Sequence, residues 1–380
     1  MKKVFLTMAC LFMVIALISC SGSAPKQLTD REILVKIYET MNGPNWKEAD
    51  GENWNSDKPI EEWKGVKVND EGRVISLAIQ GDSLQGLIPA EIGGLTELEQ
   101  LTIDWRELKM PNVIPAEIGK LTKLKVLRIR TFLYGSKSDM PEFPDLTTLV
   151  NLEDLFLSGF RGAIPENIGK LSKLHSLRLQ GFEGEIPESI CALTNLEKLL
   201  LTSTFQPENA VPDCIGKLSS LKFLTIDYST GWAGGIEQPN AKFPESIWDL
   251  TNLEELSLRA ISNTGGPIPG DKVAKMTHLK MINIGECGIT GTIPAEFFTS
   301  DKLTKFSIYK NNLTGSIPAE VGNCVTLRSL SLNENQLTGK IPAELAKCVK
   351  LTVCDLSNNQ LSPELPAAMK AHPNFSKFKF

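Results

Sequence analysis

The segment from Lys310 to Leu351 reads KNNLTGSIPAEVGNCVTLRSLSLNENQLTGKIPAELAKCVKL, so nearly the same sequence occurs twice in succession. The pattern extends over most of the chain, because one apolar residue recurs at intervals of 22 residues (Leu155 to Leu177) to 32 residues (Leu224 to Leu256). We call these residues the anchors: Leu77, Leu101, Leu127, Leu155, Leu177, Leu199, Leu224, Leu256, Ile282, Phe306, Leu330 and Cys354. A second apolar residue follows each anchor by two positions, which predicts a short strand with one buried face. Such units cannot bury an apolar face alone, so the chain is predicted to stack them around one continuous core.

After each strand the better-formed units carry the sequence G-x-I-P. Examples are Gly86 with Ile88-Pro89, and Gly339 with Ile341-Pro342. Proline has no N–H to give to a ladder, so this side of each unit is predicted to be turns. The full pattern, L-x-x-L-x-L-x-x-N-x-L-x-G-x-I-P, resembles the plant-type leucine-rich repeat family over residues 73–362. The resemblance implies an α/β solenoid, a right-handed horseshoe-shaped superhelix with a parallel concave β-sheet and turn or 3-10 segments on the convex side.

The units differ from one another in two ways. Asn311, Asn335 and Asn359 occupy the family's asparagine position, where the amide is expected to bond neighbouring backbone, whereas the middle units lack it. The units that begin at Leu127 and Leu224 are long, with extra residues at 131–140 and 229–242. These insertions are either binding loops on one rim of the solenoid or tolerated surface loops.

Residues 1–19 are predicted to be a secretory signal peptide. Lys2-Lys3 precede an apolar run that is too short for a transmembrane helix, and Leu17-Ile18-Ser19-Cys20 resembles a bacterial lipobox. That resemblance implies cleavage before Cys20 and a lipid on its sulfur, with residues 20–28 as a short tether. It places the protein in the bacterial cell envelope, at the outer membrane, on either its surface or its periplasmic side. The alternative is an ordinary leader with an incidental cysteine.

Two caps are predicted to flank the repeats. Residues 29–72 begin with Thr29-Asp30-Arg31-Glu32, a capping-box pattern, followed by a helix with one apolar face that ends at Gly43. Trp63-Lys64-Gly65-Val66 resembles the N-terminal cap of plant receptors, in which two cysteines flank the motif. Here Glu61 and Val68 stand in those places, so packing has to replace the cap disulfide. Residues 363–380 are predicted to cover the last repeat with Phe375, Phe378 and Phe380.

The residues give no support for an enzyme, a cofactor or a metal site. The three histidines lie far apart, without cysteine or carboxylate at ligand spacing, and catalytic motifs are absent. The formal net charge of −5 argues against a nucleic-acid partner. Cys324 and Cys348 are predicted to be buried free thiols. Cys191 and Cys214 lie in adjacent units and either form a disulfide or remain separate.

The candidate binding surface is the concave face of the third to eighth repeats. Large or planar side chains gather there: Trp105, Arg128, Arg130, Phe156, Arg178, Leu200, Asp227, Tyr228 and Arg259, rimmed by the loops that hold Tyr134 and Trp232. Exposed aromatic residues and arginines are the usual anchors of interfaces, and arginine pairs well with carboxylates. Later repeats carry small residues such as Ser307 and Ser331 in the same rows. The alternative is that the arginines merely stack on Phe156 and shield it.

Two functions are compatible with this sequence. One is a lipid-anchored recognition protein that binds a protein, peptide or glycan on its concave face, with a membrane contact through Cys20. The other is a structural envelope component without a dedicated ligand. The concave patch favours the first.

Overall fold

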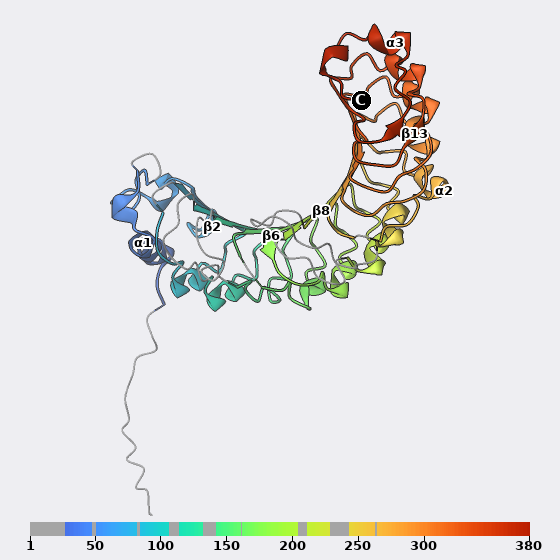
Figure 1. Cartoon of the computed structure of the whole chain (residues 1–380). Helices are drawn as coiled ribbons and strands as arrows, with labels where there is room; N and C mark the ends of the chain where they lie inside the picture. Colours follow the sequence, from blue (N-terminus) through green and yellow to red (C-terminus); the bar gives the residue numbers. More distant parts are fainter. Residues whose placement is uncertain are drawn as a thin grey trace, which may run out of the picture.

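The chain forms a curved solenoid with strands along its inner side and short helices along its outer side (Figure 1). The computed structural model describes residues 27–47, 51–81, 84–105, 114–131, 142–160, 162–203, 211–228, 243–262 and 264–380. Cys20 and the leader therefore lie outside the described residues. The curvature follows from the repeat, because an extended strand on one side is matched by bulkier helical turns on the other.

The inner side is a 13-stranded sheet in which strands follow one another in chain order. Its strands are β1 (Val66–Val68), β2 (Val74–Gly81), β3 (Gln100–Trp105), β4 (Val126–Thr131), β5 (Asp154–Ser158), β6 (Ser176–Phe182), β7 (Lys198–Ser203), β8 (Phe223–Asp227), β9 (Glu255–Arg259), β10 (Met281–Gly285), β11 (Lys305–Tyr309), β12 (Ser329–Ser331) and β14 (Val353–Asp355). Among the described strands of this sheet, β1 alone runs antiparallel to its neighbour. All twelve anchors are paired in the predicted register, from Leu77 opposite Leu101 to Leu330 opposite Cys354.

The outer side consists of short helical segments, as predicted, and most of them begin directly after a proline, whereas η6 begins three residues after Pro165. They are η3 (Ala90–Gly94), η4 (Ala116–Lys120), η6 (Ile168–Lys170), η7 (Glu188–Ala192), η8 (Asp213–Lys217), η9 (Glu245–Asp249), η10 (Ala295–Thr299), η11 (Ala319–Asn323) and η12 (Ala343–Lys347), with the α-helix α2 (Gly270–Val273). The fixed φ of proline suits the residue that starts a helical turn.

The asparagines of the last repeats bond backbone inside the turn, as predicted. Asn335 is buried; its Nδ2 donates to the carbonyls of Ile308 (2.8 Å) and Leu332 (3.0 Å), and its Oδ1 accepts from the Leu313 N–H (3.1 Å). In the middle repeats the same position holds Phe160 and Phe182, both fully buried. Apolar packing there replaces the amide network.

The N-terminal cap contains helix α1 (Asp30–Thr40), two 3-10 turns, η1 (Gly43–Asn45) and η2 (Ile60–Glu62), and strand β1. Thr29 and Glu32 form the predicted capping box. The expectation that Gly43 ends the helix is wrong, because Asn42 adopts the left-handed conformation (φ 62°) and Gly43 starts η1. Asparagine tolerates this conformation better than most residues.

Aromatic packing takes the place of the disulfide that the similar caps of plant receptors contain. The rings of Trp46, Trp54 and Trp63 are buried and pack one against the next. The centroids of Trp46 and Trp54 are 5.3 Å apart, and those of Trp54 and Trp63 are 5.4 Å apart. Arg31 lies over Trp63, with its guanidinium carbon 5.0 Å from the ring centroid. Such contacts add stability beyond the buried apolar area, so the cap holds together through its rings.

The C-terminal cap closes the free edge of the large sheet. It contains α3 (Ala367–Lys370) and η13 (Phe375–Lys377), and a small sheet of β13 (Thr338–Gly339) and β15 (Gln360–Leu361) lies beside it. Lys379 pairs with the last strand, because its N–H donates to the Cys354 carbonyl and its carbonyl accepts from the Leu356 N–H. The Phe378 ring packs against His372 at 4.9 Å.

The six cysteines of the described residues separate into one disulfide and four buried thiols. Cys191 and Cys214 are bonded, which decides between the two alternatives of the sequence. Cys324 and Cys348 are free and buried, as predicted, and so are Cys287 and Cys354. Burial raises the pKa of the Cys324 thiol to about 12, so this thiol stays neutral at physiological pH.

Candidate binding surface

Strands β4 to β8 place one continuous row of side chains on the concave face. Arg128, Phe156, Arg178, Leu200 and Thr225 are successive partners across these strands. Parallel strands lie about 4.8 Å apart, so the first four residues span roughly 14 Å. The structure therefore brings the centre of the predicted patch together.

Asp154 links the two arginines of this row. Its Oδ2 accepts from Nη2 of Arg128 at 2.6 Å, and its Oδ1 accepts from Nη2 of Arg178 at 3.1 Å. The Asp154 side chain is 18% exposed, whereas that of Arg128 is 46% exposed. Pairs at this degree of exposure contribute about 0–1 kcal/mol, so they orient the arginines more than they stabilise the fold.

Arg178 also stacks on the aromatic ring beside it. Its guanidinium carbon lies 4.7 Å from the centroid of Phe156, and Phe156 is half-buried. This is the arrangement expected if arginine shields the ring. A stack of this kind contributes about 0.5–1 kcal/mol at an exposed site. Leu200, the partner of Arg178 on the next strand, is also half-buried.

The next row contains further ion pairs. Arg130 donates through Nε to Asp104 at 3.0 Å, and the bond to Asp104 raises the pKa of Arg130. Arg259 donates to Glu286 at 3.3 Å, and Asp227 is its neighbour on β8. The predicted arginines are thus largely neutralised by the protein's own carboxylates.

Tyr228 does not lie on the binding surface, and this part of the prediction is wrong. Its side chain is fully buried and packs edge-on against Phe182, with ring centroids 5.9 Å apart. In the regular repeats the residue four after the anchor has a positive φ, as in Gly181 (φ 96°) and Glu286 (φ 56°). A bulky ring resists that conformation, and Tyr228, at the same position, turns into the core instead.

The other predicted positions have different outcomes. Ser307 lies in the predicted row, between Asn283 and Ser331, but only 3% of it is exposed. The backbone of Trp105 ends β3, but its side chain lies outside the described residues. Tyr134 and Trp232 also lie outside the described residues.

The sequence reasoning missed one row of the concave face, formed by the residues directly before the anchors. This row includes Asp154, Ser176, Lys198, Phe223 and Glu255. The signal was present in the sequence, because side chains alternate along a strand and both neighbours of a buried anchor face the same side.

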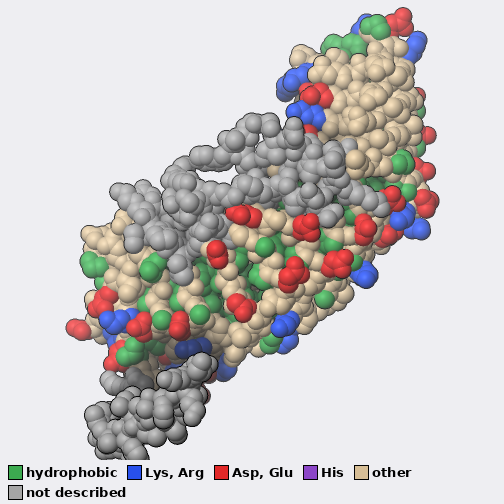
Figure 2. Space-filling view, turned by 60° about the horizontal axis from the view of Figure 1, so that its bottom comes forward, with side chains coloured by type: hydrophobic (Ala, Val, Ile, Leu, Met, Phe, Trp, Pro, Cys, Tyr) green, Lys and Arg blue, Asp and Glu red, His purple; other side chains and the backbone are tan. Residues whose placement is uncertain are grey.

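The outer face has a different character. An acidic residue recurs in the first turn of the outer helices: Glu91, Glu117, Glu188, Asp213, Glu245, Asp271, Glu296, Glu320 and Glu344. Figure 2 shows Asp and Glu side chains spread along this side. They are distributed rather than gathered, and nowhere in the described residues do three His, Cys, Asp or Glu side chains come together as a metal site would require.

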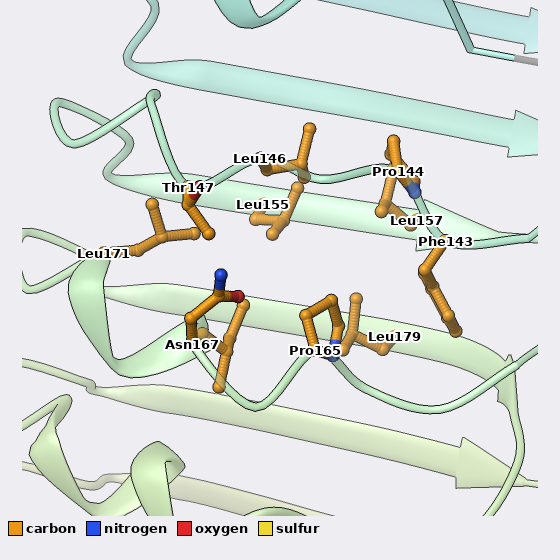
Figure 3. Close-up of a pocket in the computed structure, with 11 residues that line it drawn as sticks. Phe143, Pro144, Leu146, Thr147, Leu155, Leu157, Pro165, Asn167, Leu171 and Leu179 are labelled. Atoms are coloured by element: carbon orange, nitrogen blue, oxygen red, sulfur yellow. The ribbon is translucent and has the colours of Figure 1, made fainter. Parts of the chain in front are cut away.

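A small apolar cavity lies between the third and fourth repeats (Figure 3). Its lining includes Phe143, Pro165 and Leu179, and Thr147 faces Asn167 across it. Its volume is about 20 Å³, which has room for about one water molecule. The cavity therefore cannot take a peptide or a sugar.

Comparison with known families decides the class of the protein. The family model described as "Leucine-rich repeat region" matches residues 132–285, and the model "Leucine Rich Repeat" matches residues 302–324 and 326–348. The chain is a leucine-rich repeat protein. Among curated proteins, none matches its sequence. Within the described part of this leucine-rich repeat protein, no helix is both long and apolar enough to cross a membrane.

Solved structures of plant receptors share the leucine-rich repeat fold. The PEPR1–AtPEP1 structure is 26% identical, with a TM-score of 0.62 over 90% of this chain and 50% of that one. The plant peptide hormone receptor RGFR1 in complex with RGF2 is 26% identical, with a TM-score of 0.57 over 84% of this chain and 60% of that one. The ectodomain of the Arabidopsis receptor kinase HAESA, in complex with an IDA peptide hormone ligand, is 22% identical, with a TM-score of 0.68 over 92% of this chain and 60% of that one. At that identity the HAESA likeness concerns the fold alone. The chain thus spans 50% to 60% of the length of these structures.

Proposed function

We propose that this leucine-rich repeat protein is a recognition protein that binds a peptide or protein segment on the concave face of its third to eighth repeats. The observation that carries the proposal is the row Arg128, Phe156, Arg178 and Leu200, in which planar and apolar groups are held in fixed positions by one rigid sheet. Side chains that are already ordered lose little entropy on binding. The likeness to RGFR1, a peptide hormone receptor solved with RGF2, supports a peptide over a glycan.

A second candidate is a structural envelope component without a ligand. The ion pairs of Asp154 and the stacking of Arg178 on Phe156 favour this candidate, because these surface groups already have partners within the protein. Substitutions distinguish between the two candidate functions. Arg128→Ala, Phe156→Ala and Arg178→Ala should each weaken binding of a captured partner by more than about 1 kcal/mol in a calorimetric titration.

Ser331→Ala is the matched control, since Ser331 faces the same side in a later repeat. It should leave the affinity unchanged. Equal loss at Ser331 and at the three central residues would place the site elsewhere.

The proposal includes a lipid anchor at Cys20 and a place in the bacterial cell envelope, at the outer membrane. The lipobox-like sequence Leu17–Cys20 supports this. Cys20→Ala should move the protein from the membrane fraction to the soluble fraction after cell lysis and sedimentation. A variant that still sediments with membrane at the wild-type level would refute the anchor while leaving the recognition function open.

A further inference from the structure

The arginines of the concave face are poor sites for an incoming anion. Arg128 and Arg178 share Asp154, Arg130 is paired with Asp104, and Arg259 with Glu286. A ligand carboxylate would have to displace a carboxylate that is already positioned. The charge that is open to a ligand has to be sought outside this network.

Lys198 is such a charge. It is exposed on β7 and forms no ion pair with a described carboxylate, and the adjacent Glu197 pairs instead with Lys222 at 2.9 Å. In its own row the nearest carboxylates, Asp154 and Glu255, are each two strands away. Two strand spacings are about 10 Å, a distance at which salt screens most of the interaction between exposed charges.

Apolar groups stand directly beside this lysine. Its ammonium lies 5.8 Å from the ring centroid of Phe223 on the next strand. Leu200 follows two residues later on the same face of β7, and both apolar side chains are half-buried. The surface thus offers one uncompensated cation against one aromatic and one aliphatic group.

We infer that Lys198, Phe223 and Leu200 form the specificity-determining subsite, and that it takes an acidic residue next to an apolar or aromatic residue of an extended peptide. The inference rests on the proposed function and names the chemistry of its ligand. A carboxylate gains a charge-assisted bond from Lys198 without displacing another partner, and the neighbouring apolar side chain covers Phe223 and Leu200. The paired arginines then lie beside the subsite as ordered neighbours.

The test uses a phage-displayed library of random twelve-residue peptides, selected on the purified protein. Selected sequences should be enriched in an Asp or Glu adjacent to an apolar or aromatic residue. Lys198→Gln should weaken a selected peptide by about three- to tenfold in fluorescence anisotropy. The same peptide with its acid replaced by the corresponding amide should no longer respond to that substitution.

Lys305→Gln is the matched control, because Lys305 lies in the same row on β11, four strands away, and should not affect binding. Enrichment without an acidic residue, or equal effects at Lys198 and Lys305, would overturn the subsite while peptide recognition stands. If the protein enriches no peptide at all, the proposed function itself fails.

Discussion

At the scale of single residues, the backbone of each turn is held by one buried side chain. Asn335 makes bonds to three separate backbone groups of its own and the preceding repeat. Phe160 and Phe182 fill the same place with apolar volume. The two solutions are not interchangeable, because an unpaired buried N–H or C=O costs about 1–3 kcal/mol.

Asn335→Ala should therefore lower the free energy of unfolding by about 2–5 kcal/mol, since several backbone groups lose their partner at once. Asn333→Ala should cost less than about 0.5 kcal/mol, because Asn333 faces the concave side and its side chain donates only to Glu334. Urea unfolding followed by circular dichroism measures both. Similar losses at the two positions would show that the turn does not depend on the amide.

At the scale of the element, charges alternate along one flank of the solenoid. For the anchors from Leu101 to Ile282, the residues two before are Glu99, Lys125, Glu153, His175, Glu197, Lys222, Glu254 and Lys280, all formally charged except His175. Neighbours form ion pairs, such as Lys125 with Glu99 and Lys222 with Glu197, each at 2.9 Å. Exposed pairs contribute little stability, but a slip by one repeat would set like charges side by side, so the alternation favours the native register.

The strands were more predictable than the surface they carry. Every anchor lies in its predicted pairing because one apolar pattern fixes register across the whole sheet. The binding surface was harder to predict, because it depends on the direction of each side chain and on the side chains next to it. The link from Asp154 to two arginines and the inward turn of Tyr228 follow from local backbone and packing, which the period of the sequence does not encode.

At the scale of the whole molecule, both ends of the large sheet are blocked. The N-terminal edge is the short antiparallel strand β1, whose register is irregular at Lys67 and Val68, and the other edge is covered by Lys379. Such devices prevent edge-to-edge pairing of chains. The long concave face is left as the surface on which a partner can meet ordered side chains.

Photo-crosslinking from the two faces tests the central claim, that recognition occurs on the concave side. A photoreactive phenylalanine analogue is placed at Thr225, in the concave row, or at Lys170, exposed on the outer helix η6. Both variants are illuminated in intact cells that express the full chain. The account predicts a discrete crosslinked product from Thr225 that a selected peptide competes away, and none from Lys170. A product from Lys170 alone, or equal products from both positions, would contradict it.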